Sequence, residues 1–259
     1  ALKAALSAIH PDGMTDLVSS FPLKEGATIL RKLPSYERWA IDLLTHGDYD
    51  DYWKQRGYAP AEYYDEHADV PTLYLGGWYD SYARNTCECY TSLSRLKKSP
   101  QRLLMGPWTH GGYEVTHAGD VDFGTESHID YLDLKLGWFD HYMKDMNTEA
   151  ADWSPVRFFT MGTGDGKPND EGRLSQGGYW RSEPDWPLPN TSFTPYYLHG
   201  DGSLSQERPG QGGLPLSTFT FDPTNPVPTI GGGISAANHI MAPGAYDQRG
   251  RPDFFGCKD

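Results

Sequence analysis

Two short apolar runs stand out against a polar, glycine-rich background in the middle of the chain. The first, "VPTLYLGGWY", occupies residues 70–79, and the second, "QRLLMGPWTH", occupies residues 101–110. Proline, glycine or charged residues bound each run, a pattern that predicts a short buried strand. We expect the first strand to be entered through Pro71 and the second to end at Gly106-Pro107.

Apolar residues at helical spacing follow each of these runs. Residues at spacings of three and four predict one face of a helix after the first run, namely Tyr82, Thr86, Cys89, Leu93 and Leu96. The same spacing predicts another helix after a polar loop, at Ile129, Leu132, Leu136, Phe139 and Met143. The order strand, helix, strand, loop, helix predicts a parallel α/β sheet over residues 69–145.

The regions on either side of residues 69–145 differ from them in residue composition. Residues 2–9 are small and apolar and predict a buried strand or a short helix before the turn signal "HPDG". Residues 14–68 are rich in aromatic and charged types and predict a helical insertion, in which "SYERWAIDLL" forms a helix with Ser35 as its N-cap. Beyond residue 152, short strand candidates separated by turn residues predict an all-β domain, a sandwich or jelly roll: "PVRFFTMG", "TPYYLHG" and "STFTFDP".

Charge and cysteine content exclude several classes of partner. The 259 residues carry a net charge of −13, with a pI near 5.0. Nucleic acid is therefore not expected as a partner, because phosphate binding requires a basic surface. The three cysteines fit neither a disulfide framework nor a zinc site, and no apolar run reaches the roughly 18 residues of a membrane span. We expect no metal, no cofactor and no membrane partner, with the cytoplasm as the default location.

Candidate chemistry gathers where the two predicted strands end. Asp80 follows the first predicted strand, and His110 follows the second. Carboxyl ends of adjacent parallel strands lie about 4.8 Å apart, so the two side chains can meet there. A carboxylate on one ring nitrogen of histidine orients the imidazole and leaves the other nitrogen as a general base. The alternatives are that Asp80 only caps a helix and that His110 is an ordinary loop histidine.

A family resemblance changes the balance between these readings. "GGWYDSY", "GPWTHGG", "GDVDFG", "LGWFDHYMK", "PVRFFTMG", "YYLHGDGSLS" and "FDPTNPVPTIGG" together resemble the CocE/NonD acyl hydrolases, relatives of the X-Pro dipeptidyl-peptidases and α-amino-acid ester hydrolases. The resemblance implies a partial α/β-hydrolase core at residues 1–13 and 69–148. It also implies a helical cap at 14–68 and a partial β jelly roll at 152–259. It makes Asp80 and His110 the acid and base of a Ser-His-Asp triad acting on small ester, amide or peptide substrates.

The nucleophile of such a triad is not visible in the sequence. The family carries it in a Gly-x-Ser-Tyr-x-Gly elbow, and no Gly-x-Ser-x-Gly occurs here. The resemblance places the serine and the oxyanion-hole tyrosine upstream of Ala1, so we expect the chain to be a fragment that associates with that upstream part or forms a homo-oligomer. Ser7, Ser81 and Ser127 lie in no elbow motif and are not expected to replace it.

Other side chains have both a structural and a functional reading. Trp78, Tyr79 and Trp108 either pack the strand ends or line the acyl pocket. The acidic segment "EYYDEH", residues 62–67, is either a solvated face or a site for a substrate ammonium group. His117 and His128, near Asp120 and Asp122, lack metal-ligand spacing and are read as structural. A serine acyl hydrolase is the leading function, with an X-Pro dipeptidyl-peptidase or other aminopeptidase, or a non-catalytic fragment or binding module, as alternatives.

Overall fold

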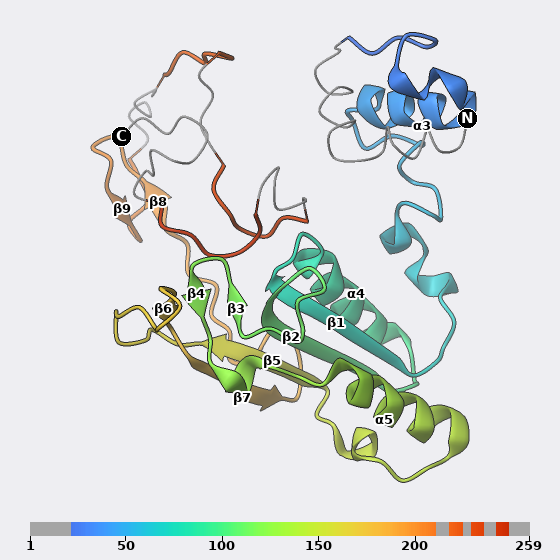
Figure 1. Ribbon diagram of the computed structural model, residues 1–259, viewed down its shortest axis with the longest axis vertical. Coiled ribbons are helices and arrows are strands. Elements are labelled where there is room, and N and C mark those ends of the chain that lie inside the picture. The colour runs from blue at the N-terminus through green and yellow to red at the C-terminus, as the bar shows by residue number, and fades with distance from the viewer. Residues whose placement is uncertain (1–21, 211–217, 225–228, 236–241, 249–259) are drawn as a thin grey trace.

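The fold is seen in a computed structural model that describes residues 22–210, 218–224, 229–235 and 242–248 (Figure 1). The predicted strand at residues 2–9 lies outside the described residues. The centre of the molecule is a four-stranded sheet in the order β1-β2-β5-β7. Its strands are β1 (Thr72–Tyr79), β2 (Gln101–Thr109), β5 (Val156–Met161) and β7 (Gly178–Glu183).

Pairing within this sheet bears out the α/β prediction and extends it. β1, β2 and β5 are parallel, whereas β5 and β7 are antiparallel. The predicted end of the second strand at Gly106-Pro107 is wrong, because β2 continues to Thr109. β7 was not predicted, and with β5 it carries the sheet across the predicted domain boundary at residue 152. The division into three domains stays a prediction.

Helix α4 (Ala83–Leu96) connects β1 to β2 and packs on one face of the sheet. Its buried residues are Tyr90 and Leu93, and Tyr90 packs in one cluster with Leu103 and Met105 of β2, with Cys87 partly buried against that cluster. Burial raises the pKa of the Cys87 thiol to about 11. The predicted helix is confirmed, but its predicted face is wrong in part. Its two ends, Tyr82 and Leu96, are exposed because the packed stripe is rotated toward Cys87 and Tyr90.

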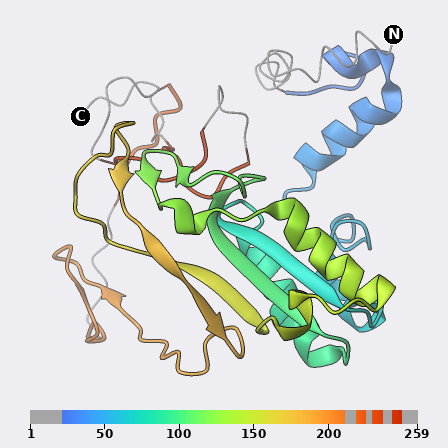
Figure 2. The ribbon, with the colours of Figure 1, turned by 60° about the horizontal axis from the view of Figure 1, so that its bottom comes forward.

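Helix α5 (Tyr131–Lys144) lies beside the opposite face of the sheet (Figure 2). Its N-cap is Asp130, whose side chain accepts a hydrogen bond from the Asp133 N–H. Its C-cap is Asp145, which adopts a left-handed conformation with φ of 53°. The helix is confirmed, but only Trp138 is buried. Of the five apolar residues used to predict the helix, Ile129 precedes it and is half-buried, and the other four are exposed, namely Leu132, Leu136, Phe139 and Met143.

The described part of residues 14–68 contains only helical elements, as predicted. These are η1 (Ile29–Lys32), α3 (Pro34–Thr45) and η2 (Pro60–Glu66). The predicted N-cap at Ser35 is wrong, because Leu33 caps α3 and Pro34 opens it, using the fixed φ of proline. Buried Glu37 accepts hydrogen bonds from Gly26 N–H and from the N–H and hydroxyl of Thr28. This carboxylate therefore ties the loop before η1 to the first turn of α3.

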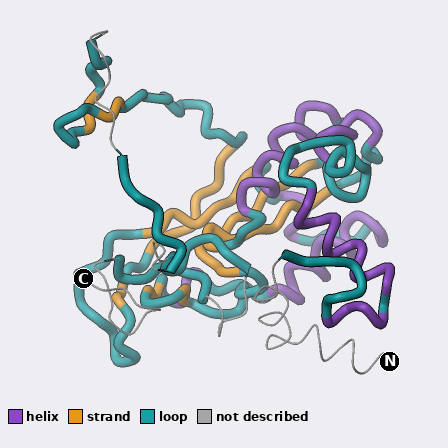
Figure 3. The backbone as a smooth tube through the Cα atoms, turned by 90° about the horizontal axis from the view of Figure 1, so that it is seen from above, coloured by secondary structure: helices purple, strands orange, loops and turns teal. Residues whose placement is uncertain are grey.

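Short strands and loops make up most of the C-terminal half (Figure 3). A three-stranded sheet pairs β3 (His117–Ala118), β4 (Val121–Asp122) and β6 (Leu174–Ser175), and a hairpin pairs β8 (Tyr197–Leu198) with β9 (Leu204–Ser205). Two 3-10 turns, η3 (Thr125–Ser127) and η4 (Glu149–Asp152), flank α5. Residues 218–222 form no strand, so the strand predicted from "STFTFDP" is wrong there. The jelly roll stays a prediction.

No helix in the described ranges combines the length and apolarity that crossing a membrane requires.

Candidate active site

Two glycines and a tryptophan set the register at the ends of β1 and β2. Gly77 lies opposite Gly106, but Tyr79 lies opposite Thr109, so β2 contains one extra residue in a bulge. A side chain at Gly77 would put its Cβ 2.2 Å from the Trp108 carbonyl oxygen, and one at Gly106 would come within 2.4 Å of the Trp108 ring. Glycines at both positions therefore give the bulge room, and the shifted register brings the residue after Tyr79 level with the residue after Thr109.

Asp80 is the residue after Tyr79, and its carboxylate is buried, with 7% of the side chain exposed. Its Oδ1 accepts hydrogen bonds from the Tyr82 N–H at 3.0 Å and from the Ser235 hydroxyl at 3.3 Å. The N-cap of α4 is Tyr82, with no side-chain cap. Asp80 is thus not the N-cap of α4, although one of its oxygens does support the turn that leads into the helix.

His110 follows Thr109, and its Nδ1 lies 2.9 Å from Oδ2 of Asp80. The hydrogen bond that the sequence predicts between these two side chains is present. The imidazole is 57% exposed, and the Tyr82 ring lies beside it with centroids 5.4 Å apart. Within the described part of the chain, Nε2 makes no hydrogen bond. The buried carboxylate therefore holds one ring nitrogen of an imidazole that is more than half exposed.

This arrangement has a definite chemical capacity. With Nδ1–H donated to Asp80, Nε2 carries the lone pair and can accept a proton from a hydroxyl. The negative charge of Asp80 stabilises the imidazolium that results. It also reaches Tyr113, whose pKa is raised by burial first and then by Tyr131 and Asp80. The pair can thus serve as general base and general acid for a nucleophile that approaches Nε2.

The three aromatic candidates take part in packing. Trp108 is buried and donates its indole N–H to the Ser127 carbonyl. The Trp78 indole N–H donates to the Phe159 carbonyl, and its ring packs against Trp186. Tyr79 packs against Phe123, and burial raises the pKa of its hydroxyl. These contacts favour the packing alternative, and a role for these residues in lining a substrate pocket stays a prediction.

The candidate serines are held in other contacts. The Ser127 side chain is buried and donates to the Gly124 carbonyl. The Ser81 hydroxyl contacts the Ser235 hydroxyl at 2.6 Å. Ser7 lies outside the described residues. Neither described serine is hydrogen-bonded to His110, so neither is placed to deliver its proton to Nε2.

The other candidate sites have ordinary partners. In the acidic segment, Glu62 accepts from the Tyr49 hydroxyl, and Glu66 pairs with Arg56. In the part of the chain that the structure describes, no three of the histidine, cysteine and acidic residues cluster as metal ligands would, His117 and His128 included. A hollow of about 290 Å³ lies elsewhere, on the α5 side of the sheet, lined in part by Leu73, Leu104 and Leu134.

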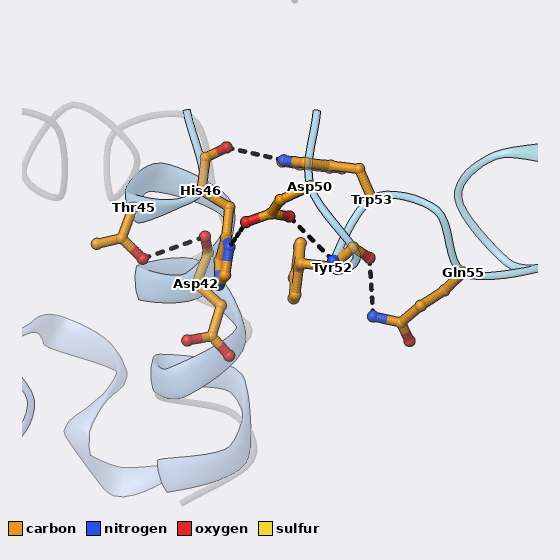
Figure 4. A network of polar contacts seen from close by, with 7 residues as sticks. All are labelled: Asp42, Thr45, His46, Asp50, Tyr52, Trp53 and Gln55. Atoms are coloured by element: carbon orange, nitrogen blue, oxygen red, sulfur yellow. Dashed lines mark hydrogen bonds and ion pairs between the residues drawn. The ribbon is translucent and has the colours of Figure 1, made fainter. Parts of the chain in front are cut away.

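The structure also reveals a second histidine–carboxylate pair, which the sequence analysis missed. At the end of α3, His46 Nδ1 lies 2.6 Å from Oδ2 of Asp50, whose other oxygen accepts from the Tyr52 N–H (Figure 4). The His46 ring stacks on Tyr52, with centroids 4.3 Å apart, and the Trp53 indole N–H donates to the His46 carbonyl. Its sequence signal was an (i, i+4) His-Asp spacing.

Comparisons with known proteins connect this geometry to a family. The family model for X-Pro dipeptidyl-peptidase (S15 family) matches residues 4–112, and that for the X-Pro dipeptidyl-peptidase C-terminal non-catalytic domain matches residues 148–226. The chain is 28% identical over 257 residues to the cocaine esterase of Rhodococcus sp. (strain MB1 Bresler), covering 94% of this chain and 40% of that one. A Mycobacterium bovis protein, provisionally named a serine esterase, is 29% identical over 155 residues, covering 58% and 21%.

A solved structure shows a weaker likeness. A CocE/NonD family hydrolase from Staphylococcus aureus superposes with a TM-score of 0.48 at 19% sequence identity, covering 69% of this chain and 28% of that one. The chain spans less than half the length of each of these three relatives. The two family models match consecutive parts of the chain, in the same order as the motifs quoted in the sequence analysis. The alignment with the cocaine esterase extends over both matched parts. The resemblance to the CocE/NonD-related hydrolases that the sequence motifs predict is therefore confirmed, with the S15 peptidase model over the first part of the chain and the model of its C-terminal domain over the second.

Proposed function

We propose that this chain supplies the acid and base of a serine acyl hydrolase. Asp80 orients His110, and His110 Nε2 takes the proton of a serine hydroxyl as that serine attacks an ester or amide carbonyl. The same proton then protonates the leaving group, and water repeats the sequence to release the acid. The single observation that carries the proposal is the 2.9 Å contact between His110 Nδ1 and the buried Asp80 carboxylate, made by an imidazole that is 57% exposed.

The serine is proposed to come from polypeptide that precedes Ala1 in a longer protein. The sequence contains no Gly-x-Ser-x-Gly elbow, and the alignment covers 40% of the cocaine esterase. An elbow places its serine at the carboxyl end of a parallel strand, which is also where Asp80 and His110 lie. The fold expected around them, an α/β-hydrolase core with a helical cap and a jelly roll, is part of this proposal.

A peptidase is the second candidate within the same mechanism. Both family models that match the chain are named for X-Pro dipeptidyl-peptidase. Peptide cleavage would require His110 to protonate an amine leaving group, and a site for the substrate ammonium. The acidic segment is less suited to that site than its composition indicates, because Glu62 and Glu66 already have partners. An ester is therefore the favoured substrate class.

Covalent labelling tests the mechanism. The full-length protein should react with a fluorophosphonate probe, and His110→Ala should abolish that labelling because the serine loses its base. The matched control is His46→Ala, which removes the other hydrogen-bonded histidine and should leave labelling intact. Labelling of the isolated 259-residue chain would contradict an upstream serine, and unchanged labelling of the His110 variant would contradict the base. Comparing p-nitrophenyl acetate with an X-Pro p-nitroanilide separates esterase from peptidase.

A further inference from the structure

Two C-terminal segments fold back over the strand ends that carry Asp80. We name residues 229–235 and 242–248 the C-terminal clasp. Its halves pair with each other, because Gly232 and Gly244 exchange backbone hydrogen bonds of 2.6 and 3.1 Å, and the Gln248 side chain donates to the Ile230 carbonyl. The clasp also docks on β3, where the Ala245 N–H donates to the Ala118 carbonyl at 3.2 Å. Hydrogen bonds within the clasp and hydrogen bonds to β3 thus fix its backbone.

Glycines let the clasp come this close. A Cβ at Gly231 would lie 2.4 Å from the Tyr246 ring, and Gly231 has a φ of 64°. A Cβ at Gly244 would lie 2.4 Å from the Gly119 nitrogen. Gly233 lies against Asp80, since a Cβ there would stand 3.3 Å from the Asp80 carbonyl oxygen. The clasp backbone therefore runs directly along the residue that holds His110.

Ser235 carries this contact to the carboxylate. Its hydroxyl donates to Asp80 Oδ1 at 3.3 Å, and the Ser81 hydroxyl lies 2.6 Å from the same oxygen of Ser235. A hydroxyl has a single proton. Because Ser235 uses its proton on Asp80, Ser81 must donate to Ser235. The two serines thus form a chain of two hydrogen bonds that ends on Asp80 Oδ1, the carboxylate oxygen that does not face His110.

We propose that Ser235 is a positioning residue that fixes the Asp80 carboxylate for His110 and joins the C-terminal segment to the catalytic pair. Oδ1 is held by Tyr82 N–H on one side and Ser235 on the other, so the carboxylate plane is fixed and Oδ2 is directed at Nδ1. Ser235 is not the nucleophile, because its hydroxyl contacts the acid and not the imidazole. The consequence for turnover rests on the proposed function, whereas the effect on His110 does not.

The test is the tautomer of His110 in the 259-residue chain. With ¹⁵N-histidine and a pH of about 8, at which unperturbed imidazoles are neutral, ring nitrogen shifts report which nitrogen carries the proton. The wild type should show the Nδ1–H form at His110. Asp80→Asn defines the full change, and Ser235→Ala should move His110 part of the way toward the Nε2–H form. Ser235→Thr keeps the hydroxyl and should restore the wild-type spectrum.

Two further variants keep this test decisive. Ser205 contacts Nε2 of His199 at 2.9 Å in the β8–β9 hairpin, so Ser205→Ala should alter His199 and leave His110 unchanged. Ser81→Ala leaves the clasp intact and should move His110 in the same direction as Ser235→Ala, by less. An unchanged His110 in Ser235→Ala, or an equal change of His110 in Ser205→Ala, overturns the proposal.

A kinetic measurement on the full-length enzyme tests whether the hydrogen bond from Ser235 to Asp80 affects turnover. We expect Ser235→Ala to lower kcat by roughly 10-fold, the low end of the worth of a hydrogen bond to a charged group because this contact is 3.3 Å long, with KM unchanged. A tautomer change without any loss of kcat would leave the positioning contact standing and would count against the proposed catalytic role of His110. The failure of one proposal is thereby distinguished from the failure of the other.

Discussion

The molecule contains two histidine–carboxylate pairs, and they differ in almost everything except the bond itself. In both, Nδ1 of histidine meets a carboxylate oxygen, at 2.9 Å for His110–Asp80 and at 2.6 Å for His46–Asp50. The shorter contact is the local one, between residues four apart at the end of α3, whereas the other joins residues 30 apart. Bond length alone would therefore select the wrong pair as the candidate for chemistry.

Burial separates the two pairs. The Asp80 side chain is 7% exposed and that of Asp50 is 44% exposed. A carboxylate shielded from water acts on its histidine through a lower effective dielectric, so it stabilises an imidazolium more strongly. The histidines differ in the opposite sense, since the His46 side chain is stacked on Tyr52 and 35% exposed, whereas that of His110 is 57% exposed. A buried acid with an exposed base is the arrangement that chemistry on an external substrate requires.

The largest expected effect comes from replacing the carboxylate of each histidine–carboxylate pair in turn. Under the proposed function, Asp80→Asn in the full-length protein should lower kcat by about 10⁴-fold, the loss found when the triad aspartate of a serine protease is changed to asparagine. The matched variant Asp50→Asn should leave kcat within about twofold, since it removes an exposed (i, i+4) pair. Steady-state kinetics on both variants measures the contrast. Near-wild-type turnover of Asp80→Asn, or an equal loss in Asp50→Asn, would remove the distinction drawn between the pairs.

A second prediction concerns the backbone that creates the non-local pair. Gly77→Ala should destabilise the fold by about 1–3 kcal/mol or more, because its Cβ would meet the Trp108 carbonyl oxygen in the bulge. Gly57→Ala is the control, since nothing lies within 4 Å of a Cβ there. Urea unfolding followed by tryptophan fluorescence measures both. Equal stability of the two variants would show that the bulge tolerates a side chain and that Gly77 does not set the register.

A third prediction tests whether the helical region that ends in the His46–Asp50 pair is independent of the sheet that carries the Asp80–His110 pair. Glu37→Gln should loosen residues 22–45, because an amide has one acceptor oxygen where the carboxylate uses two, on Gly26 and Thr28. Those hydrogen bonds, that from the Thr28 hydroxyl first, also lower the pKa of Glu37. Hydrogen exchange measured by mass spectrometry should show faster exchange in α3 and no change in β1 and β2. Faster exchange in α3 and also in β1 and β2 would mean that the helical region and the sheet are coupled.

The same contrast explains what the sequence could reveal. The Asp80–His110 contact was predictable because parallel strands place their carboxyl ends together, and both residues followed apolar runs. The bulge was not predictable, because its signal is two glycines, Gly77 and Gly106, that lie opposite each other and against Trp108, a pairing that is visible only once the register is known. The rotated face of α4, the joining of β5 and β7 to the sheet, and the clasp all depend on tertiary packing that local spacing does not encode.

The smallest effect is a pH dependence confined to the local pair. The hydrogen bond from His46 holds the pKa of Asp50 below its ordinary value, and the Tyr52 N–H contributes in the same direction. A carboxyl group whose pKa is lower in the folded state stabilises the fold above its unfolded pKa of about 3.9 and loses that contribution as pH falls through the folded value. Acid titration of wild type and Asp50→Asn should therefore show local opening near His46 below about pH 4 in the wild type, and no such step in the variant. The step should be slight, because solvent screens a half-exposed pair, and a large loss of global stability in Asp50→Asn would mean that this pair is more deeply coupled to the fold than its exposure indicates.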